Sequence, residues 1–112
     1  MKTQLTASES AKLIELGVSP ERASKRESSV AYGNGARGIM KSPEIPIFTL
    51  ADLIDILPKE INREHLEIGT DDGEWYAEYN NTTLPSSYSF APELIDALYS
   101  LLLWCLEKGY VK

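Results

Sequence analysis

The chain has 112 residues, of which 43% are hydrophobic and 25% charged, and its formal net charge is −6. This length and composition are typical of one soluble domain, residues 1–112, built around one core. Binding to nucleic acid depends on Lys and Arg that neutralise phosphates, so the negative charge makes nucleic acid a poor partner for the chain as a whole. The one cysteine, Cys105, excludes an intramolecular disulfide and fits a reducing compartment.

The N-terminal stretch MKTQLTASES lacks the apolar region of a secretory signal. The longest apolar run, residues 101–106, is far shorter than the roughly 20 residues that span a bilayer. The sequence therefore predicts a cytoplasmic protein that does not bind a membrane.

Capping sequences predict short helices in the first half of the chain. Thr6-Ala-Ser-Glu9 matches a capping box, and Gly17 stands where such a helix ends. Ser19-Pro20-Glu21 predicts one or two further helical turns, because proline is favoured at the first helical position. Thr49 is the predicted cap of a helix over residues 50–57.

Residues 25–46 have no usable periodicity and contain three glycines and two prolines. A long stretch without secondary structure in a small domain is either functional or mobile, so we expect a long mobile loop. Residues 33–38 also fit the pattern G-x-G-x-x-G. Dinucleotide binding requires a buried strand before this pattern and a long helix after it. The flanking residues predict neither, so we expect no cofactor.

The region that follows predicts strands. Residues 66–68 and 75–79 alternate between apolar and polar side chains, and Asp71-Asp72-Gly73 supplies a turn between them. This pattern indicates a β-hairpin. Residues 86–90 are a candidate third strand.

Residues 92–108, PELIDALYSLLLWCLEK, predict a terminal helix that Gly109 closes. A helix that is apolar on almost every side must be buried on more than one side or meet a partner chain. The helical spacing predicts that these residues face the core, with Trp104 at its margin: Leu94, Leu98, Leu101, Leu102 and Cys105. The opposite face, predicted to be exposed, comprises Asp96, Ser100, Leu103 and Glu107.

Together these elements predict an α+β fold. A small antiparallel sheet, formed by the hairpin and the candidate third strand, packs against the C-terminal helix. Two shorter N-terminal helices and the long Gly- and Pro-containing loop complete the predicted domain.

Charge is distributed unevenly along the chain. Residues 20–42 carry five basic and two acidic groups, whereas residues 43–112 carry four basic and thirteen acidic groups. The basic segment 20–42 could bind the acidic remainder of the chain, a neighbouring subunit or an anionic ligand. The alternative is an ordinary solvated surface segment.

No residue cluster predicts catalysis or metal binding. Asp71, Asp72, Glu74 and Glu78 gather at the hairpin, but the calcium-loop pattern is absent and charged turn residues explain them. His65, the one histidine, has no cysteine nearby at metal-ligand spacing and is predicted to be a surface residue. We therefore predict no catalytic residue, no cofactor-binding residue and no metal ligand.

Several stretches carry a resemblance to known proteins. They are residues 48–58 (FTLADLIDILP), the Gly-Glu-Trp turn at 73–75, residues 94–98 (LIDAL) and residues 102–110 (LLWCLEKGY). The chain resembles small proteins without an assigned activity that prophages and mobile elements of gut bacteria encode. The resemblance covers most of the chain apart from residues 25–42. It implies a phage-related accessory protein and assigns no site residue.

The leading hypothesis is a non-enzymatic protein-binding accessory factor of phage or mobile-element origin that acts through the sheet and the terminal helix. One alternative is an enzyme or ligand-binding domain with a pocket under the 25–46 loop, whose small-molecule ligand the sequence does not identify. Another is a nucleic-acid-associated protein that uses the basic segment 20–42. A homodimer is a further possibility, with Leu103 and Tyr99 in a two-fold contact. The predicted interaction surface is Tyr99, Leu103, Tyr110, Arg22, Lys25, Arg26, Arg37 and Lys41.

Overall fold

The structure is a computed structural model that describes residues 1–28, 44–61, 63–79 and 88–111. Its elements, in chain order, are α1 (Ala7–Glu15), η1 (Pro20–Arg22), β1 (Lys25–Ser28), β2 (Glu44–Ile47), α2 (Leu50–Ile56), β3 (Glu60–Ile61), β4 (Glu64–Asp71), β5 (Glu74–Tyr79), β6 (Tyr88–Ala91) and α3 (Leu94–Lys108). Helices and antiparallel sheets are mixed along the chain, which confirms the predicted α+β class.

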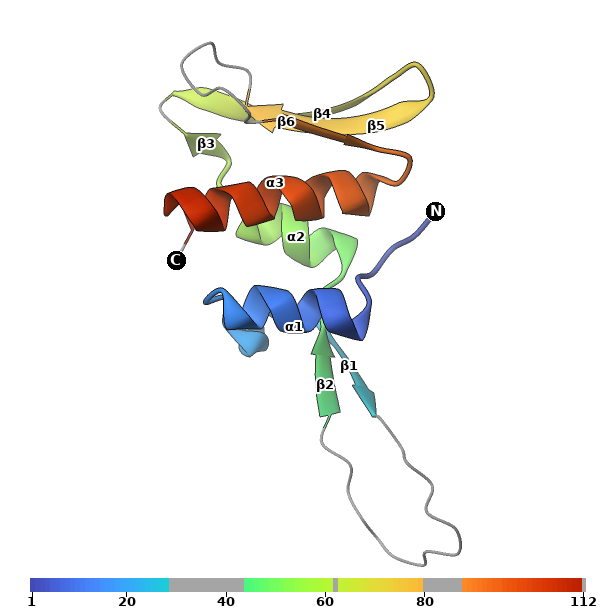
Figure 1. Cartoon of the computed structure of the whole chain (residues 1–112), viewed down its shortest axis with the longest axis vertical. Helices are drawn as coiled ribbons and strands as arrows, with labels where there is room; N and C mark the ends of the chain where they lie inside the picture. Colours follow the sequence, from blue (N-terminus) through green and yellow to red (C-terminus); the bar gives the residue numbers. More distant parts are fainter. Residues whose placement is uncertain (29–43, 62, 80–87, 112) are drawn as a thin grey trace, which may run out of the picture.

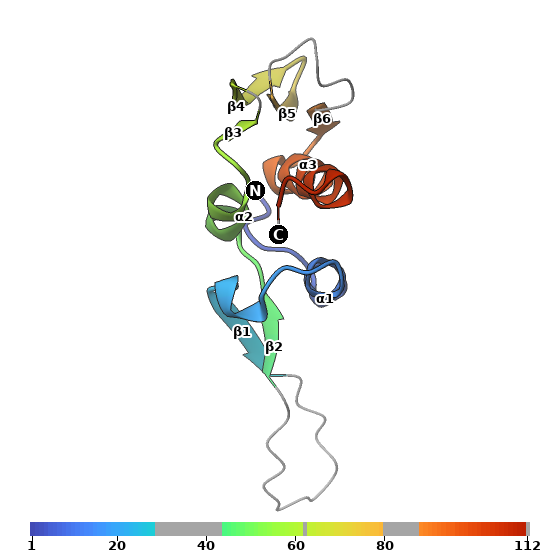
Figure 2. The same ribbon diagram turned by 90° about the vertical axis from the view of Figure 1, so that its left-hand side faces the viewer.

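The elements form layers with α3 in the middle (Figure 1). The four-stranded sheet, in the order β3-β4-β5-β6, lies on one side of α3, which contacts β5 and β6. On the other side α2 packs along α3, and α1 lies next to a second sheet formed by β1 and β2. Figure 2 shows that this two-stranded ribbon stands at the end of the molecule opposite the four-stranded sheet. The terminal helix is therefore covered on two sides, as its apolar composition predicted.

Helix ends follow the local signals in the sequence. The Thr6 side chain accepts a hydrogen bond from the backbone N–H of Glu9, and the Thr49 side chain accepts one from that of Asp52. The Glu9 and Asp52 side chains accept hydrogen bonds in return, which completes two capping boxes. Gly17 adopts a φ of +113° after α1, a conformation that favours glycine. These observations confirm the predicted starts of α1 and α2.

The terminal helix supplies much of the core. Its buried residues are Leu94, Ile95, Ala97, Leu98, Leu101, Leu102 and Cys105. They include every residue predicted to face the core, and Trp104 is partly buried at the margin, also as predicted. Gly109 ends the helix in the left-handed conformation, with a φ of +81°. No helix in the described ranges is long and apolar enough to cross a bilayer.

The hairpin of β4 and β5 is built as its sequence predicts. Asp72 and Gly73 have φ values of +50° and +80°, and Asp71 lies opposite Glu74. Two central residues with positive φ give the turn the twist that a two-residue hairpin needs. The third strand is also present as β6, which pairs with β5 and sets Phe90 opposite Tyr76.

The ends of the 25–46 segment correct the prediction of a loop. Lys25–Ser28 and Glu44–Ile47 pair as antiparallel strands, with Lys25 opposite Ile47. Sequence reasoning missed them because the pairing is non-local and neither strand has a long alternating pattern. Pro46, which cannot donate to a strand ladder, is tolerated because a two-stranded sheet has only edge strands.

Residues 29–43 lie outside the described residues. The predicted mobility of the loop and the G-x-G-x-x-G stretch at 33–38 fall within this range and stay predictions. The short strand β3, at the edge of the four-stranded sheet, was not predicted either. At two residues, it is too short to carry a strand pattern.

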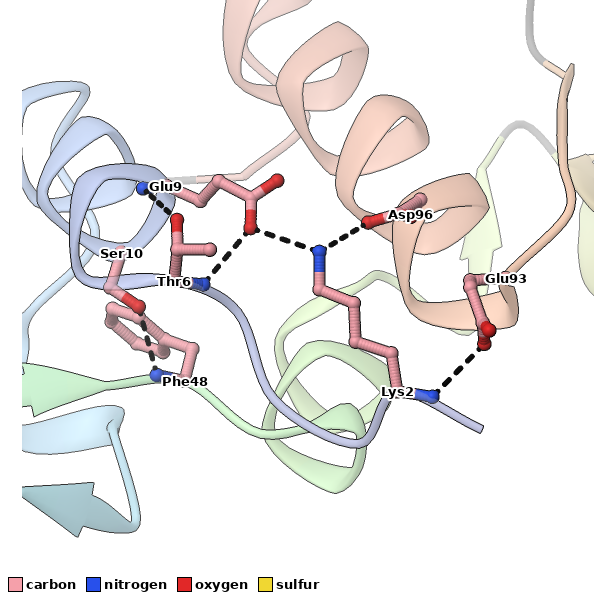
Figure 3. Close-up of polar contacts among 7 residues, drawn as sticks. All are labelled: Lys2, Thr6, Glu9, Ser10, Phe48, Glu93 and Asp96. Atoms are coloured by element: carbon pink, nitrogen blue, oxygen red, sulfur yellow. Dashed lines mark hydrogen bonds and ion pairs between the residues drawn. The ribbon is translucent and has the colours of Figure 1, made fainter.

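The N-terminal segment ties α1 to α3 (Figure 3). The Lys2 ammonium lies 3.3 Å from Glu9 Oε1 and 2.9 Å from Asp96 Oδ1. The Lys2 backbone N–H donates to Glu93 Oε2 at 3.0 Å. Because these charged groups pair with one another, the cluster links the N-terminal segment to α1 and α3. The buried Ser10 hydroxyl adds a further link, since it accepts the backbone N–H of Phe48 at 3.1 Å.

Candidate functional site

The apolar residues predicted to form a contact surface on α3 are only partly exposed. Tyr99 and Leu103 are partly buried and pack against the core. Leu103, which was expected in the middle of an exposed face, is therefore not an isolated surface leucine. Tyr110 is 37% exposed, and its ring centroid lies 5.4 Å from that of Trp104. The role of these residues in assembly stays a prediction.

The basic residues predicted for the same surface lie elsewhere. Arg22 and Lys25 belong to η1 and β1, at the end of the molecule opposite the four-stranded sheet. Arg22 is 3.6 Å from the Asp55 carboxylate, and the Lys25 ammonium donates to the Gln4 side-chain oxygen. Arg26 is exposed on β1. Arg37 and Lys41 lie outside the described residues.

Two other chemically reactive residues, His65 and Cys105, lie in different surroundings. His65 is exposed on β4, as predicted. Cys105 is buried, and its thiol lies 4.0 Å from the Tyr79 hydroxyl. Burial raises the pKa of Cys105 to about 11, although the hydrogen bond with Tyr79 lowers it slightly. Among the described residues, no group of three or more His, Cys, Asp or Glu is placed to hold a metal ion.

The surface with the most distinctive chemistry is the side of the four-stranded sheet that faces away from α3. Strand register divides the residues between two faces, since side chains alternate along each strand. Ala77 and Tyr79 are buried on the side of α3. We call the opposite surface the outer face; its described side chains come from β4, β5 and β6. They are Glu67, Gly69, Asp71, Glu74, Tyr76, Glu78 and Phe90.

Two aromatic rings stand together on the outer face. Tyr76 lies directly opposite Gly69 in the ladder, and a Cβ atom at position 69 would come within 2.7 Å of the Tyr76 hydroxyl oxygen. The ring therefore lies across the glycine, where any side chain would displace it. Phe90 stands beside it, with ring centroids 5.8 Å apart and planes tilted by 47°. Phe90 is 47% exposed, which is unusual for a large apolar side chain on the solvent side of a sheet.

An open hollow of about 250 Å³ adjoins the two rings. It is lined by Thr70, Asp71, Tyr76, Glu78 and Phe90. Drug-sized ligands occupy pockets of roughly 300–1,000 Å³, so this hollow suits one side chain better than a cofactor. It lies on the outer face of the sheet, at the end of the molecule opposite β1 and β2, which are the described parts of the 25–46 segment under which a pocket was considered.

Two carboxylates on the outer face destabilise each other's charged form. Glu67 and Glu78 are direct partners across β4 and β5. Burial raises the pKa of Glu78, and hydrogen bonding and repulsion with Glu67 raise it further. No Lys or Arg occurs in β4, β5 or β6, and none of the ion pairs among the described residues includes an outer-face carboxylate. The outer face thus combines an exposed Phe90 ring and a half-buried Tyr76 ring with negative charge that described residues do not neutralise.

Sequence reasoning identified the acidic cluster but not the site. Asp71, Glu74 and Glu78 were interpreted as charged turn residues, and neither Tyr76 nor Phe90 was among the predicted site residues. The missed signal was Gly69, because a glycine inside a strand often marks a place where another group approaches the backbone closely. The partner of that glycine follows only from the strand register.

Comparison with known proteins gave no relative for this chain. No family model matches it, and neither a curated protein nor a solved structure shows significant similarity to it.

Proposed function

We propose that this chain is a non-enzymatic protein-binding factor that contacts its partner through the outer face of the four-stranded sheet. The phage or mobile-element origin implied by the sequence resemblance is part of the same proposal. The observation that carries the proposal is the ring pair of half-buried Tyr76 and exposed Phe90 on a surface where antiparallel sheets ordinarily carry polar side chains.

Aromatic side chains support binding more strongly than other exposed residues. They are enriched at the centres of protein interfaces, because they bury a large area at a low cost in conformational entropy. The Tyr76 ring also packs over Gly69, where an added Cβ atom would come within 2.7 Å of its hydroxyl oxygen. A ring that is already ordered loses little freedom when a partner covers it.

The alternative functions have less support. An enzyme needs convergent groups that can act as acid, base or nucleophile, whereas of the described His65 and Cys105 one is exposed and the other buried. A nucleic-acid-associated protein needs unpaired basic groups on one surface. Arg22 and Lys25, however, have partners within the chain.

Site-specific photo-cross-linking tests the proposal. A photoreactive phenylalanine analogue replaces Tyr76 in the full chain, and the protein is irradiated in an extract of the source organism. We expect one dominant cross-linked protein. The matched control carries the same analogue at Ser100, which is exposed on α3, and it should give no such product.

Two results would count against the outer face. Equal cross-linking at Ser100 would show non-specific contact. Cross-linking of a partner from Tyr99 and not from Tyr76 would place the binding surface on α3, where the sequence prediction put it.

A further inference from the structure

The outer face has features that select a particular kind of partner, and the following inference rests on the proposed function. We propose that the hollow beside Tyr76 and Phe90 receives an arginine side chain from a partner protein. The guanidinium stacks on one of the two rings, contacts the other and donates hydrogen bonds to the Glu78 carboxylate.

Charge is the first argument. The hollow is lined by Asp71 and Glu78, and Glu67 stands directly across the ladder from Glu78. Burial raises the pKa of Glu78, and hydrogen bonding and repulsion with Glu67 raise it further. A cation beside these two carboxylates would offset their repulsion, whereas an anionic or neutral partner would not.

Ring geometry is the second argument. The faces of aromatic rings carry negative electrostatic potential and attract cations within about 6 Å of the ring centroid. The Tyr76 and Phe90 centroids are 5.8 Å apart, and both residues line the hollow. A cation seated in the hollow would therefore contact both rings.

The shape of the site favours arginine over lysine. A guanidinium is planar, so it stacks on a ring and donates parallel hydrogen bonds to a carboxylate at the same time. An ammonium is a compact point charge that holds its water strongly. A hollow of about 250 Å³ that is open to solvent accommodates one such side chain at the end of a partner segment.

A second copy of this chain is a competing occupant. Its exposed Arg26 lies on β1, at the end of the molecule opposite the four-stranded sheet. Copies joined in this way would associate head to tail, and association of that kind depends on protein concentration. The experiment below separates this arrangement from a partner protein.

The test is a titration of the full-length chain, followed by amide NMR, with the peptide acetyl-Gly-Arg-Gly-amide at low salt and neutral pH. Two further peptides replace the arginine with lysine or with citrulline, a neutral side chain of almost the same shape. We expect shifts at Gly69, Tyr76, Glu78 and Phe90 with arginine, weaker binding with lysine and none with citrulline.

Matched variants locate the charge effect. Glu78→Gln should weaken arginine binding by about tenfold, the scale of one lost charge-assisted hydrogen bond. Asp72→Asn removes the same charge from the exposed turn outside the hollow and should leave binding unchanged. Amide spectra of both variants confirm that the fold is retained.

Three outcomes would overturn the inference. They are equal binding of citrulline, an equal effect of Asp72→Asn, and shifts that lie away from the outer face. Concentration-dependent shifts of the same amides without peptide would identify a second copy as the occupant. If cross-linking from Tyr76 still captures a partner while the arginine peptide fails, the proposed function stands and the arginine assignment is wrong.

Discussion

Cys105 shows how packing sets the chemistry of a single residue in this protein. The sequence predicted an inert core thiol from its position in an apolar helix, and the structure confirms that the side chain is buried. Burial raises its pKa to about 11, so the reactive thiolate is scarce at neutral pH.

Cys105 should therefore resist alkylation by iodoacetamide in the folded protein near neutral pH and react only after unfolding. Mass spectrometry after timed labelling, with and without denaturant, measures this protection. As a control, Ser100→Cys places a thiol on the exposed side of the same helix and should be labelled quickly. Equal labelling at both positions in the native state would show that α3 opens readily.

Glu78 is a second residue whose pKa is raised in the folded protein, but its carboxyl group lies on the outer face and not in the core. A carboxyl group with a raised pKa in the folded chain binds its proton more tightly when folded than when unfolded. Stability is therefore lost as the pH rises from the ordinary value of 4.5 through the raised pKa.

Glu78→Gln should consequently increase the free energy of unfolding at neutral pH, and this gain should disappear below the ordinary pKa of 4.5. Urea denaturation on either side of that pH measures the difference. A gain that persists in acid would show that packing, and not charge, favours glutamine. Together with the weaker arginine binding expected of the same variant, the result would describe a site that gives up stability for recognition.

At the scale of elements, α3 organises the fold. It contacts β5 and β6 on one side and α2 on the other. Leu98 and Leu101 lie in its buried stripe and belong to the core cluster. Removing a buried leucine side chain costs its transfer free energy and also leaves a cavity among the packed neighbours.

Leu98→Ala should reduce the free energy of unfolding by about 2–5 kcal/mol, because Leu98 is 0% exposed. Chemical denaturation monitored by tryptophan fluorescence measures the change. Ser100→Ala, two residues along on the exposed side, should stay within about 0.5 kcal/mol of the natural chain. A denaturation midpoint that hardly moves with Leu98→Ala would contradict the core assignment.

At the scale of the whole molecule, the two sheets stand at opposite ends (Figures 1 and 2). The four-stranded sheet carries the acidic outer face, and β1 at the other end belongs to the segment 20–42, in which basic residues predominate. This separation makes it feasible to remove one end without altering the other.

Replacing residues 29–43 with an Asn-Gly turn tests which end binds the partner. Ser28 and Glu44 are direct partners in the ribbon, so a short hairpin turn joins them. We expect a thermal midpoint equal to or slightly above that of the natural chain, because a shorter loop costs less closure entropy. Cross-linking from Tyr76 should be retained. Loss of the partner with the fold intact would favour the alternatives that place function in the 25–46 segment.

Sequence reasoning predicted the elements whose determinants lie close together along the chain. The capping boxes of α1 and α2 act over three residues, and the positive-φ pair Asp72-Gly73 fixes its own hairpin. The buried stripe of α3 follows from helical spacing alone. Each of these signals involves interactions within a few residues, so a reader of the sequence has all the partners in view.

The features that only the tertiary structure decided involve contacts between residues that are distant in sequence. The pairing of β1 with β2, the partly buried position of Leu103 and the meeting of Tyr76 with Phe90 all depend on neighbours brought together by folding. Composition located the acidic residues near the hairpin, but strand register placed Gly69, Tyr76 and Glu78 on one face. A shift of one residue in that register would have turned the same side chains toward α3, which is why the candidate site was not evident from the sequence by itself.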